Sequence, residues 1–284
     1  MVDFLTLRHR SFQLALAPEQ GGAVRAFAWG ERQILRPTPE SAGDDPFEMA
    51  CFPMVPYVNR IAHGRFEFAG RTVQLERNWS ADPHPIHGQA WRRPWSIATA
   101  TPSTAVLSFD GGADEWPWRY RCEQRFVLDD EGLSIELGLE NLGVTPMPAM
   151  LGLHPYFPDK AHARMSARLP RVWRTDAGSL PVEQVETSPE WAFEPRRPVG
   201  ATNLDHCFAG WDGLAVLEWP DRRLTLRAVR CSCLQVYAPA GRDFFCIEPQ
   251  TAPPGALERG AEEAAVLVPG ERLSIEIRLS PGER

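Results

Sequence analysis

The sequence has no long apolar run, and residues 1–10 lack the apolar segment of a signal peptide. No window approaches the roughly 18 consecutive apolar residues that a membrane-spanning helix requires. We therefore expect a protein that does not act in a membrane, and we expect it in the cytoplasm.

Three common enzyme signatures are also missing. The chain contains no GxSxG nucleophile motif, no GxxxxGK[ST] phosphate-binding loop and no GxGxxG dinucleotide fingerprint. Acyl transfer, nucleotide hydrolysis and hydride transfer consequently lose most of their support.

Positive charge is in deficit. The chain has 30 Lys and Arg residues against 37 Asp and Glu, a formal net charge of -7, and its arginines are scattered among carboxylates. Nucleic acid and anionic membranes are therefore unfavourable partners. A small neutral molecule is the ligand class that the charge balance favours.

Cysteine and histidine do not form a recognisable metal or disulfide pattern. The six cysteines show no CxxC spacing, which favours reduced, buried thiols in a cytosolic protein. Pro85 and Ile86 separate His84 from His87, and the proline prevents the two histidines from sharing a helical face. We expect no metal cofactor. The cysteines are Cys51, Cys122, Cys207, Cys231, Cys233 and Cys246.

Alternation of apolar and polar residues is the pattern that recurs along the chain. Residues 133–139 and 273–279 are clear examples, and residues 66–75 indicate a hairpin with a turn at Ala69-Gly70. The 27 prolines and 22 glycines suit many short strands with tight connections. The pattern predicts an all-β protein, with residues 1–284 as one large antiparallel sandwich domain.

Irregular segments are few in this prediction. Residues 36–47 are predicted to form a surface loop, and residues 174–203 to make excursions from the sandwich because strand signals are weak there. Only residues 256–265 have a pattern compatible with a short helix, which Gly260 weakens.

Polar residues gather in five short clusters inside otherwise apolar sequence. Glu248 follows an apolar run, 244–247, that is predicted to be a buried strand. A carboxylate there is either a structural ion pair or a general base with a raised pKa. The clusters span residues 53–61, 84–88, 152–157, 204–208 and 244–250.

Two histidines and one tryptophan each have a structural and a functional interpretation. His154 and His87 each lie between apolar neighbours, as a core histidine or a proton donor would. Gly88, directly after His87, allows backbone or ligand to approach closely. Trp91 is either core material or an aromatic face that packs against a sugar ring.

Together the five clusters resemble the aldose 1-epimerase (galactose mutarotase-like) family, in order and over nearly the whole chain. Gln89 departs from the family pattern, in which a second glycine or an acid often follows the H-G motif, and this bears on substrate preference. The similar motifs are N-R-I…G-R-F-x-F-x-G within residues 55–70, H-G at 87–88, G-x-H-P-Y-F at 152–157, D-H-C-F-x-G-W-D-G at 205–213 and E-P at 248–249.

The resemblance implies a super-sandwich with a sugar-binding cleft on one face, and a mutarotase that interconverts α and β anomers. It implies that Glu248 is the general base for the anomeric hydroxyl and that His154 is the acid for the ring oxygen. Arg60, His87 and Asp205 are implied to orient the sugar.

The chemistry of anomer exchange is compatible with such a pair. Ring opening removes a proton from O1 and delivers one to O5, and closure reverses both transfers, so one acid and one base suffice. We therefore expect a monosaccharide substrate and no cofactor.

Alternatives remain open at this point. A hexose-6-phosphate 1-epimerase on the same fold would need cations, for which Arg60, Arg65, Arg92 and Arg93 are candidates. A non-catalytic carbohydrate-binding protein, or a lyase or hydrolase for polysaccharides, is a further alternative. The sequence also leaves the preferred aldose undetermined, and leaves both a monomer and a homodimer open.

Overall fold

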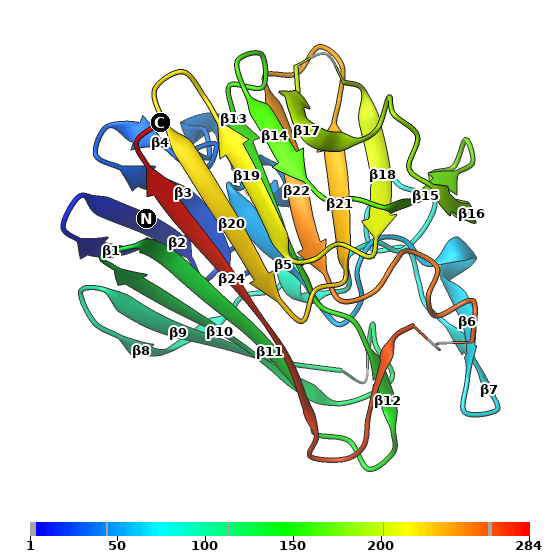
Figure 1. The fold of residues 1–284 in the computed structure, drawn as a ribbon. Coiled ribbons are helices and arrows are strands. Elements are labelled where there is room, and N and C mark those ends of the chain that lie inside the picture. The colour runs from blue at the N-terminus through cyan, green and yellow to red at the C-terminus, as the bar shows by residue number, and fades with distance from the viewer. Residues whose placement is uncertain (1–3, 44, 113, 201, 261–262) are drawn as a thin grey trace.

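Two large antiparallel sheets packed face to face form most of the molecule (Figure 1). The structure is a computed structural model that describes residues 4–43, 45–112, 114–200, 202–260 and 263–284. The predicted all-β super-sandwich is confirmed.

The larger sheet carries the strands that will matter for the site. It has 11 strands in the order β1-β2-β3-β5-β13-β22-β21-β18-β15-β16, with β4 paired to β3 outside this path. Its strands are β1 (Leu5–His9), β2 (Phe12–Ala17), β3 (Ala23–Trp29), β4 (Arg32–Gln33), β5 (Cys51–Met54), β13 (Gly152–Pro158), β15 (Arg171–Thr175), β16 (Pro181–Glu186), β18 (Leu204–Ala209), β21 (Cys233–Ala238) and β22 (Phe244–Gln250).

The second sheet has nine strands in the order β17-β14-β19-β20-β24-β11-β10-β9-β8. Its strands are β8 (Ser96–Ala100), β9 (Thr104–Gly111), β10 (Tyr120–Asp129), β11 (Gly132–Asn141), β14 (Arg164–Ala167), β17 (Phe193–Pro198), β19 (Leu214–Glu218), β20 (Arg223–Val229) and β24 (Arg272–Gly282).

Short elements connect and flank the two sheets. No helix in the part of the chain that the structure describes is long and apolar enough to cross a membrane. The short elements are the strand pairs β6 (Arg65–Phe68) with β7 (Arg71–Gln74) and β12 (Met147–Ala149) with β23 (Ala265–Leu267), and the 3-10 helices η1 (Glu40–Ala42), η2 (Pro46–Glu48), η3 (Ala62–Gly64) and η4 (Ala90–Arg92).

The alternating segments become strands because one face of each is apolar. β11 and β24 pair in register, with Ile135 opposite Ile277 and Leu137 opposite Ile275. All four side chains are at most 2% exposed. Burying each contributes roughly 1.5–3 kcal/mol, so a slip by one residue would turn these side chains to solvent.

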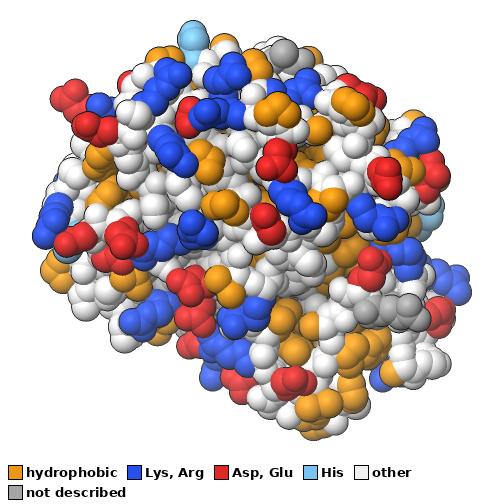
Figure 2. Space-filling model, viewed as in Figure 1, with side chains coloured by type: hydrophobic (Ala, Val, Ile, Leu, Met, Phe, Trp, Pro, Cys, Tyr) orange, Lys and Arg blue, Asp and Glu red, His pale blue; other side chains and the backbone are white. Residues whose placement is uncertain are grey.

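The opposite face of the nine-stranded sheet carries charges of both signs. Figure 2 shows cationic and anionic side chains interspersed over β20, β24 and β11. Arg272 of β24, for example, contacts Glu136 on the adjacent strand β11 and Glu123 on β10, one strand further away. Ion pairs of this exposed kind contribute little to stability but keep the surface free of a large field of one sign.

Some local predictions were wrong. The predicted helix at 256–265 is absent from the described residues: 254–260 form turns and 265–267 form β23, while 261–262 lie outside the described part. Gly255 and Gly260 both adopt positive φ, which is incompatible with a continuous helix.

Other segments contain more structure than the sequence suggested. Residues 174–203 contain β16 and β17, each at the edge of a sheet, where weak strand signals are tolerated. Residues 36–47 include η1 and part of η2, with residue 44 outside the described part. The 65–74 hairpin is confirmed, as are the six free, buried cysteines.

Candidate active site

A cleft of about 620 Å³ crosses the central strands of the 11-stranded sheet, on the face turned away from the nine-stranded sheet. The orientation follows from β22, where Phe245 contacts Trp219 of the β19–β20 turn in the sandwich interior. Because side chains alternate along a strand, Glu248 points to the opposite face and reaches the cleft.

The catalytic candidates His154 and Glu248 lie on neighbouring strands. The ladder between β13 and β22 pairs Tyr156 with Cys246, and in the same register His154 faces Glu248 two residues further along. Nε2 of His154 lies 3.3 Å from Oε1 of Glu248. The structure therefore brings together the two residues that the sequence analysis selected as acid and base.

Stacked rings hold the imidazole in place. The ring of His154 packs against Phe52 of β5, at 4.5 Å between centroids, and against Tyr156, at 4.8 Å. Both contacts are stacked, with interplanar angles of 29° and 21°. The side chain can therefore move little, which suits a group that transfers protons over a fixed distance.

Burial shifts both protonation equilibria toward the uncharged forms. It lowers the pKa of His154 to about 3, with a smaller lowering by the Arg36 cation, opposed by a backbone hydrogen bond. It raises the pKa of Glu248 well above the usual range, and the Asp205 carboxylate raises it further while Arg60 lowers it. A strongly shifted acid and base in one cleft is typical of an active site.

One end of the cleft presents hydrogen-bonding groups fixed by their neighbours. Nε of Arg60 donates to the Asp82 carboxylate at 2.8 Å. On β18 and β21, the Gln235 amide donates to Asp205 at 2.6 Å and accepts a longer hydrogen bond from Asn59 at 3.4 Å. All five residues line the cleft, and their fixed donors and acceptors suit a ligand with several hydroxyls.

His87 enters the same end of the cleft from a strained turn. Its φ is +59°, and that of the following Gly88 is +72°. A Cβ atom on Gly88 would lie 1.9 Å from the carbonyl oxygen of Val55, so only glycine permits this approach of the two backbones. The imidazole is buried, lies edge-on to His154 at 5.4 Å, and has a pKa lowered well below the usual range, mainly by burial.

The structure does not support sugar contact by Trp91. This side chain is 0% exposed and is not among the residues that line the cleft. Its indole N–H donates to the carbonyl of Gly88 and its ring packs edge-on against His87, so it supports the turn from behind. Trp79, which packs against Trp91 and lines the cleft, is the tryptophan that a ligand can reach.

Gln89 also lies outside the cleft. Its side chain is 3% exposed, lines a different depression, and leaves Oε1 without a hydrogen-bond partner. Any effect of this residue on substrate preference must act through the neighbouring turn.

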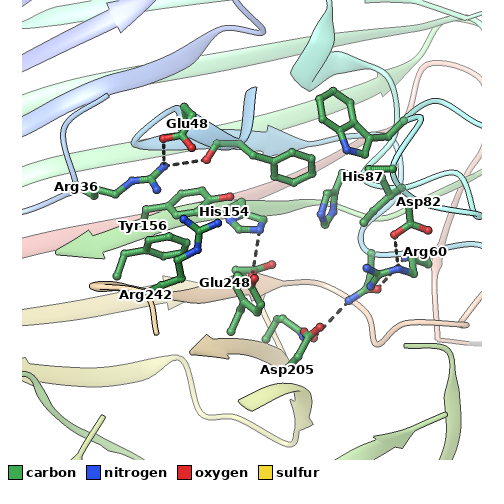
Figure 3. A pocket seen from close by; sticks show the side chains of 18 of the residues that line it. Arg36, Glu48, Arg60, Asp82, His87, His154, Tyr156, Asp205, Arg242 and Glu248 are labelled. Atoms are coloured by element: carbon green, nitrogen blue, oxygen red, sulfur yellow. Dashed lines mark hydrogen bonds and ion pairs between the residues drawn. The ribbon is translucent and has the colours of Figure 1, made fainter. Parts of the chain in front are cut away.

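Sequence reasoning missed the arginines at the other end of the cleft. Figure 3 shows Arg36 and Arg242 on one side of the His154–Glu248 pair, with His87, Arg60 and Asp82 on the other. Arg36 donates to the carbonyl of Phe47 and lies 4.2 Å above the Tyr156 ring. No motif singled out either arginine, because both lie in irregular segments.

A buried amine fixes the turn that carries Arg242. Lys160, the only lysine of the chain, is 4% exposed. Its Nζ donates to the carbonyls of Thr202, Ala238 and Pro239 at 3.0, 3.0 and 2.6 Å. These bonds hold the end of β21 and the start of the turn to β22.

Gln235 was also missed, although the sequence contains a signal for it. It is a buried polar residue between Leu234 and Val236 in a strand of buried residues. Buried polar groups are normally hydrogen-bonded, and a polar interruption of an apolar strand is therefore worth selecting as a candidate.

One set of potential metal ligands occurs in the described residues. Ligand atoms of His154, Cys246 and Glu248 all lie within 4.8 Å of one another, and all three residues are buried. The remaining chemistry of the cleft is acid and base catalysis on a small, hydroxyl-rich ligand.

Known proteins resemble this chain over nearly its whole length. The family model described as Aldose 1-epimerase matches residues 3–280. The chain is 30% identical over 286 residues to YphB of Escherichia coli (strain K12), which is described as uncharacterized, covering 96% of this chain and 97% of that protein.

Solved structures agree with this match. A proposed aldose 1-epimerase from Escherichia coli K12 superposes with a TM-score of 0.93 at 28% identity, covering 99% of both chains. A galactose mutarotase-like protein from Clostridium acetobutylicum superposes with a TM-score of 0.86 at 19% identity, covering 98% of this chain and 95% of that one. The second likeness is one of fold.

Proposed function

The chain belongs to the aldose 1-epimerase family, and from this premise and the cleft we propose that it is a mutarotase that interconverts the α and β anomers of an aldose. Family membership supports an isomerase-type enzyme with a sugar substrate. The observation that carries the finer proposal is the separation of 3.3 Å between His154 Nε2 and Glu248 Oε1 in a cleft lined by fixed hydrogen-bonding side chains.

In the proposed reaction Glu248 takes the proton from O1 as His154 gives one to O5. The C1–O5 bond breaks, C1 becomes an aldehyde, and rotation about C1–C2 presents its other face. Closure reverses the transfers: O5 attacks C1, its proton returns to His154, and Glu248 protonates O1. Each positioned transfer contributes roughly 10²- to 10⁴-fold to the rate.

The two protonation states needed for this cycle differ in the position of a single proton. One is imidazolium with carboxylate, and the other is imidazole with carboxylic acid. Burial favours the uncharged pair in the empty cleft, as the opposite pKa shifts of His154 and Glu248 indicate. A sugar hydroxyl that donates to Glu248 stabilises the carboxylate and so favours the charged pair.

We assign the binding of the sugar hydroxyls to Arg60, His87 and Asp205. Asp82 and Gln235 support this assignment because they hold Arg60 and Asp205 through hydrogen bonds of 2.8 and 2.6 Å. The aromatic contact is assigned to Trp79 in place of Trp91. All bonds made and broken are served by protein acids and bases, so the proposal includes no cofactor.

The alternative of a hexose-6-phosphate 1-epimerase is less well supported by the arginines named for it. Of those four, Arg60 alone lines the cleft, and it is neutralised by Asp82. Arg92 and Arg93 are both paired with Glu115 outside the cleft. A non-catalytic sugar-binding protein has no need of a shifted acid and base in contact, and a polysaccharide lyase or hydrolase has no support from a particular observation here.

The direct test is anomer exchange of a freshly dissolved sugar. Polarimetry of α-glucose and α-galactose, each with a blank for the spontaneous reaction, should show faster approach to equilibrium with the protein. Glucose 6-phosphate in the same assay separates the phosphate-specific alternative. Sugar binding by calorimetry without faster exchange would contradict catalysis and favour the binding protein.

Two broader assignments complete the proposal. We propose that residues 1–284 act as one domain, because the larger of two apolar clusters contains residues from Leu7 to Leu279. We propose a cytoplasmic location, since six free, buried cysteines suit a reducing compartment.

A further inference from the structure

We propose that His154, Cys246 and Glu248 form a binding site for a zinc-class divalent cation, and that the bound cation blocks the proposed catalytic pair. The site itself rests on geometry and donor chemistry. Its inhibitory effect rests on the proposed function.

The three side chains converge because of strand geometry. Cys246 and Glu248 are two residues apart on β22 and therefore point to the same face of the sheet. His154 faces Glu248 from β13, and Cys246 pairs with the next outward residue of β13, Tyr156. No loop contributes a ligand, so the arrangement is as rigid as the centre of the sheet.

The distances suit a small cation. Because no two of the three ligand atoms are more than 4.8 Å apart, a point exists within roughly 2.8 Å of all three. Bonds from zinc to histidine nitrogen and carboxylate oxygen are about 2.0–2.2 Å, and to thiolate about 2.3 Å. Shifts of at most about 0.5–0.8 Å in each side chain would complete the coordination.

The donor set also matches zinc chemistry. Zinc binds thiolate, imidazole and carboxylate and prefers four ligands in a tetrahedron, so three protein ligands leave one position for water or a sugar hydroxyl. Calcium and magnesium prefer oxygen ligands and more of them, which this set does not supply. On binding, the cation displaces the thiol proton of Cys246 to solvent and forms the metal–sulfur bond.

The proposed ion would occupy both groups that the reaction needs. Nε2 of His154 and the carboxylate of Glu248 cannot transfer protons while they are metal ligands. Cys246 is 0% exposed and has no part in the proposed reaction, so removing it separates metal binding from catalysis.

The experiment titrates the protein with cobalt(II) and zinc(II) chlorides and compares Cys246→Ala with Cys122→Ala. Cys122 is a matched control because it is also 0% exposed but lies in β10 of the other sheet. We expect a thiolate-to-cobalt charge-transfer band in the wild type and in Cys122→Ala, and none in Cys246→Ala. Zinc should inhibit anomer exchange, with the half-inhibitory concentration raised about tenfold or more in Cys246→Ala.

The outcomes are distinguishable from those of the catalytic proposal. Absence of the cobalt band in the wild type, or an unchanged band in Cys246→Ala, overturns the site whether or not the protein is an epimerase. A protein that binds cobalt through Cys246 but does not accelerate anomer exchange retains the site and loses the proposed function. Cys246→Ser, which keeps the volume of the side chain, repeats the comparison if the alanine variant does not fold.

Discussion

His154 and Glu248 occupy facing positions on adjacent antiparallel strands, and the 3.3 Å between Nε2 and Oε1 follows from that register. The pairing of β13 with β22 therefore positions the two reacting groups of this site, whereas in many enzymes loops position such groups. Its precision comes from the hydrogen bonds and packing of the sheet, and rigid elements place reacting groups more accurately than loops.

We predict that His154→Asn and Glu248→Gln each lower kcat by at least about 100-fold, or roughly 2.7 kcal/mol of barrier. Each variant keeps the size of its side chain but loses one proton transfer. Polarimetry of α-glucose or α-galactose measures the effect, and His162→Asn, which changes an exposed histidine, is the control. Near-normal exchange in either variant would remove that residue from the mechanism.

The pH dependence should reflect the shifts within the pair. Catalysis needs the pair to hold one proton in total. A second proton is added to His154 only below its lowered pKa of about 3, and the last proton leaves Glu248 only above its raised pKa. The pair therefore holds one proton at every pH between these two values. We therefore expect no loss of kcat/KM as the pH falls from 7 to 5, through the usual histidine range. A loss of kcat/KM on acidification with its midpoint near pH 6.5, with circular dichroism unchanged, would contradict the assignment of His154.

Glu248 should also reduce stability as the pH rises. Its folded pKa is raised, so its contribution to stability is present below the ordinary glutamate value of 4.5 and is lost as the pH rises toward the raised value. Glu248→Gln does not ionise, and we expect its Tm to exceed that of the wild type by at least about 2 °C at pH 8. Scanning calorimetry should show a smaller difference at pH 5; an equal difference at both values would reject the ionisation argument.

Asp82 should act on binding through Arg60. Asp82→Asn removes the charge that holds the Arg60 guanidinium, and we expect KM to rise about 3- to 10-fold with little change in kcat. Glu115→Gln weakens the pairs with Arg92 and Arg93 outside the cleft and should leave KM unchanged. A larger rise in KM for Glu115→Gln than for Asp82→Asn would indicate that the substrate binds near Arg92 and Arg93 and not beside Arg60.

Gly88 should be far less tolerant than a glycine of similar backbone conformation. Gly88 and Gly70 have φ of +72° and +75°, but a Cβ atom meets the Val55 carbonyl at 1.9 Å in the first and nothing within 4 Å in the second. Gly70→Ala therefore costs about 1–2 kcal/mol for its conformation alone. Gly88→Ala should cost more in urea unfolding and should also lower activity by displacing His87.

Much of the fold was accessible from the sequence because its cause is local. Alternation predicted β11 and β24, since one face of each strand is buried and the other is solvated. Such patterns do not reveal which strands become neighbours. The approach of His154 to Glu248 depends on the pairing of β13 with β22, and the residues alone left it undetermined.

The site predictions failed where side-chain direction depends on a turn. Trp91 follows the His87-Gly88 turn closely in sequence, but the backbone there sends its indole behind the cleft, where it bonds to the Gly88 carbonyl. Arg242 reaches the cleft because Lys160 fixes a distant turn through main-chain carbonyls. Tertiary contacts of this kind leave no periodic trace in the sequence.

The environment of Lys160 has a practical consequence for labelling. The chain offers a single side-chain amine, and folding hides it behind three carbonyl groups. Acylating reagents aimed at lysine should therefore leave the folded protein unmarked at this position and modify it only when the sandwich opens. Mass spectrometry after a timed pulse of such a reagent would measure the fraction of molecules that opened during the pulse.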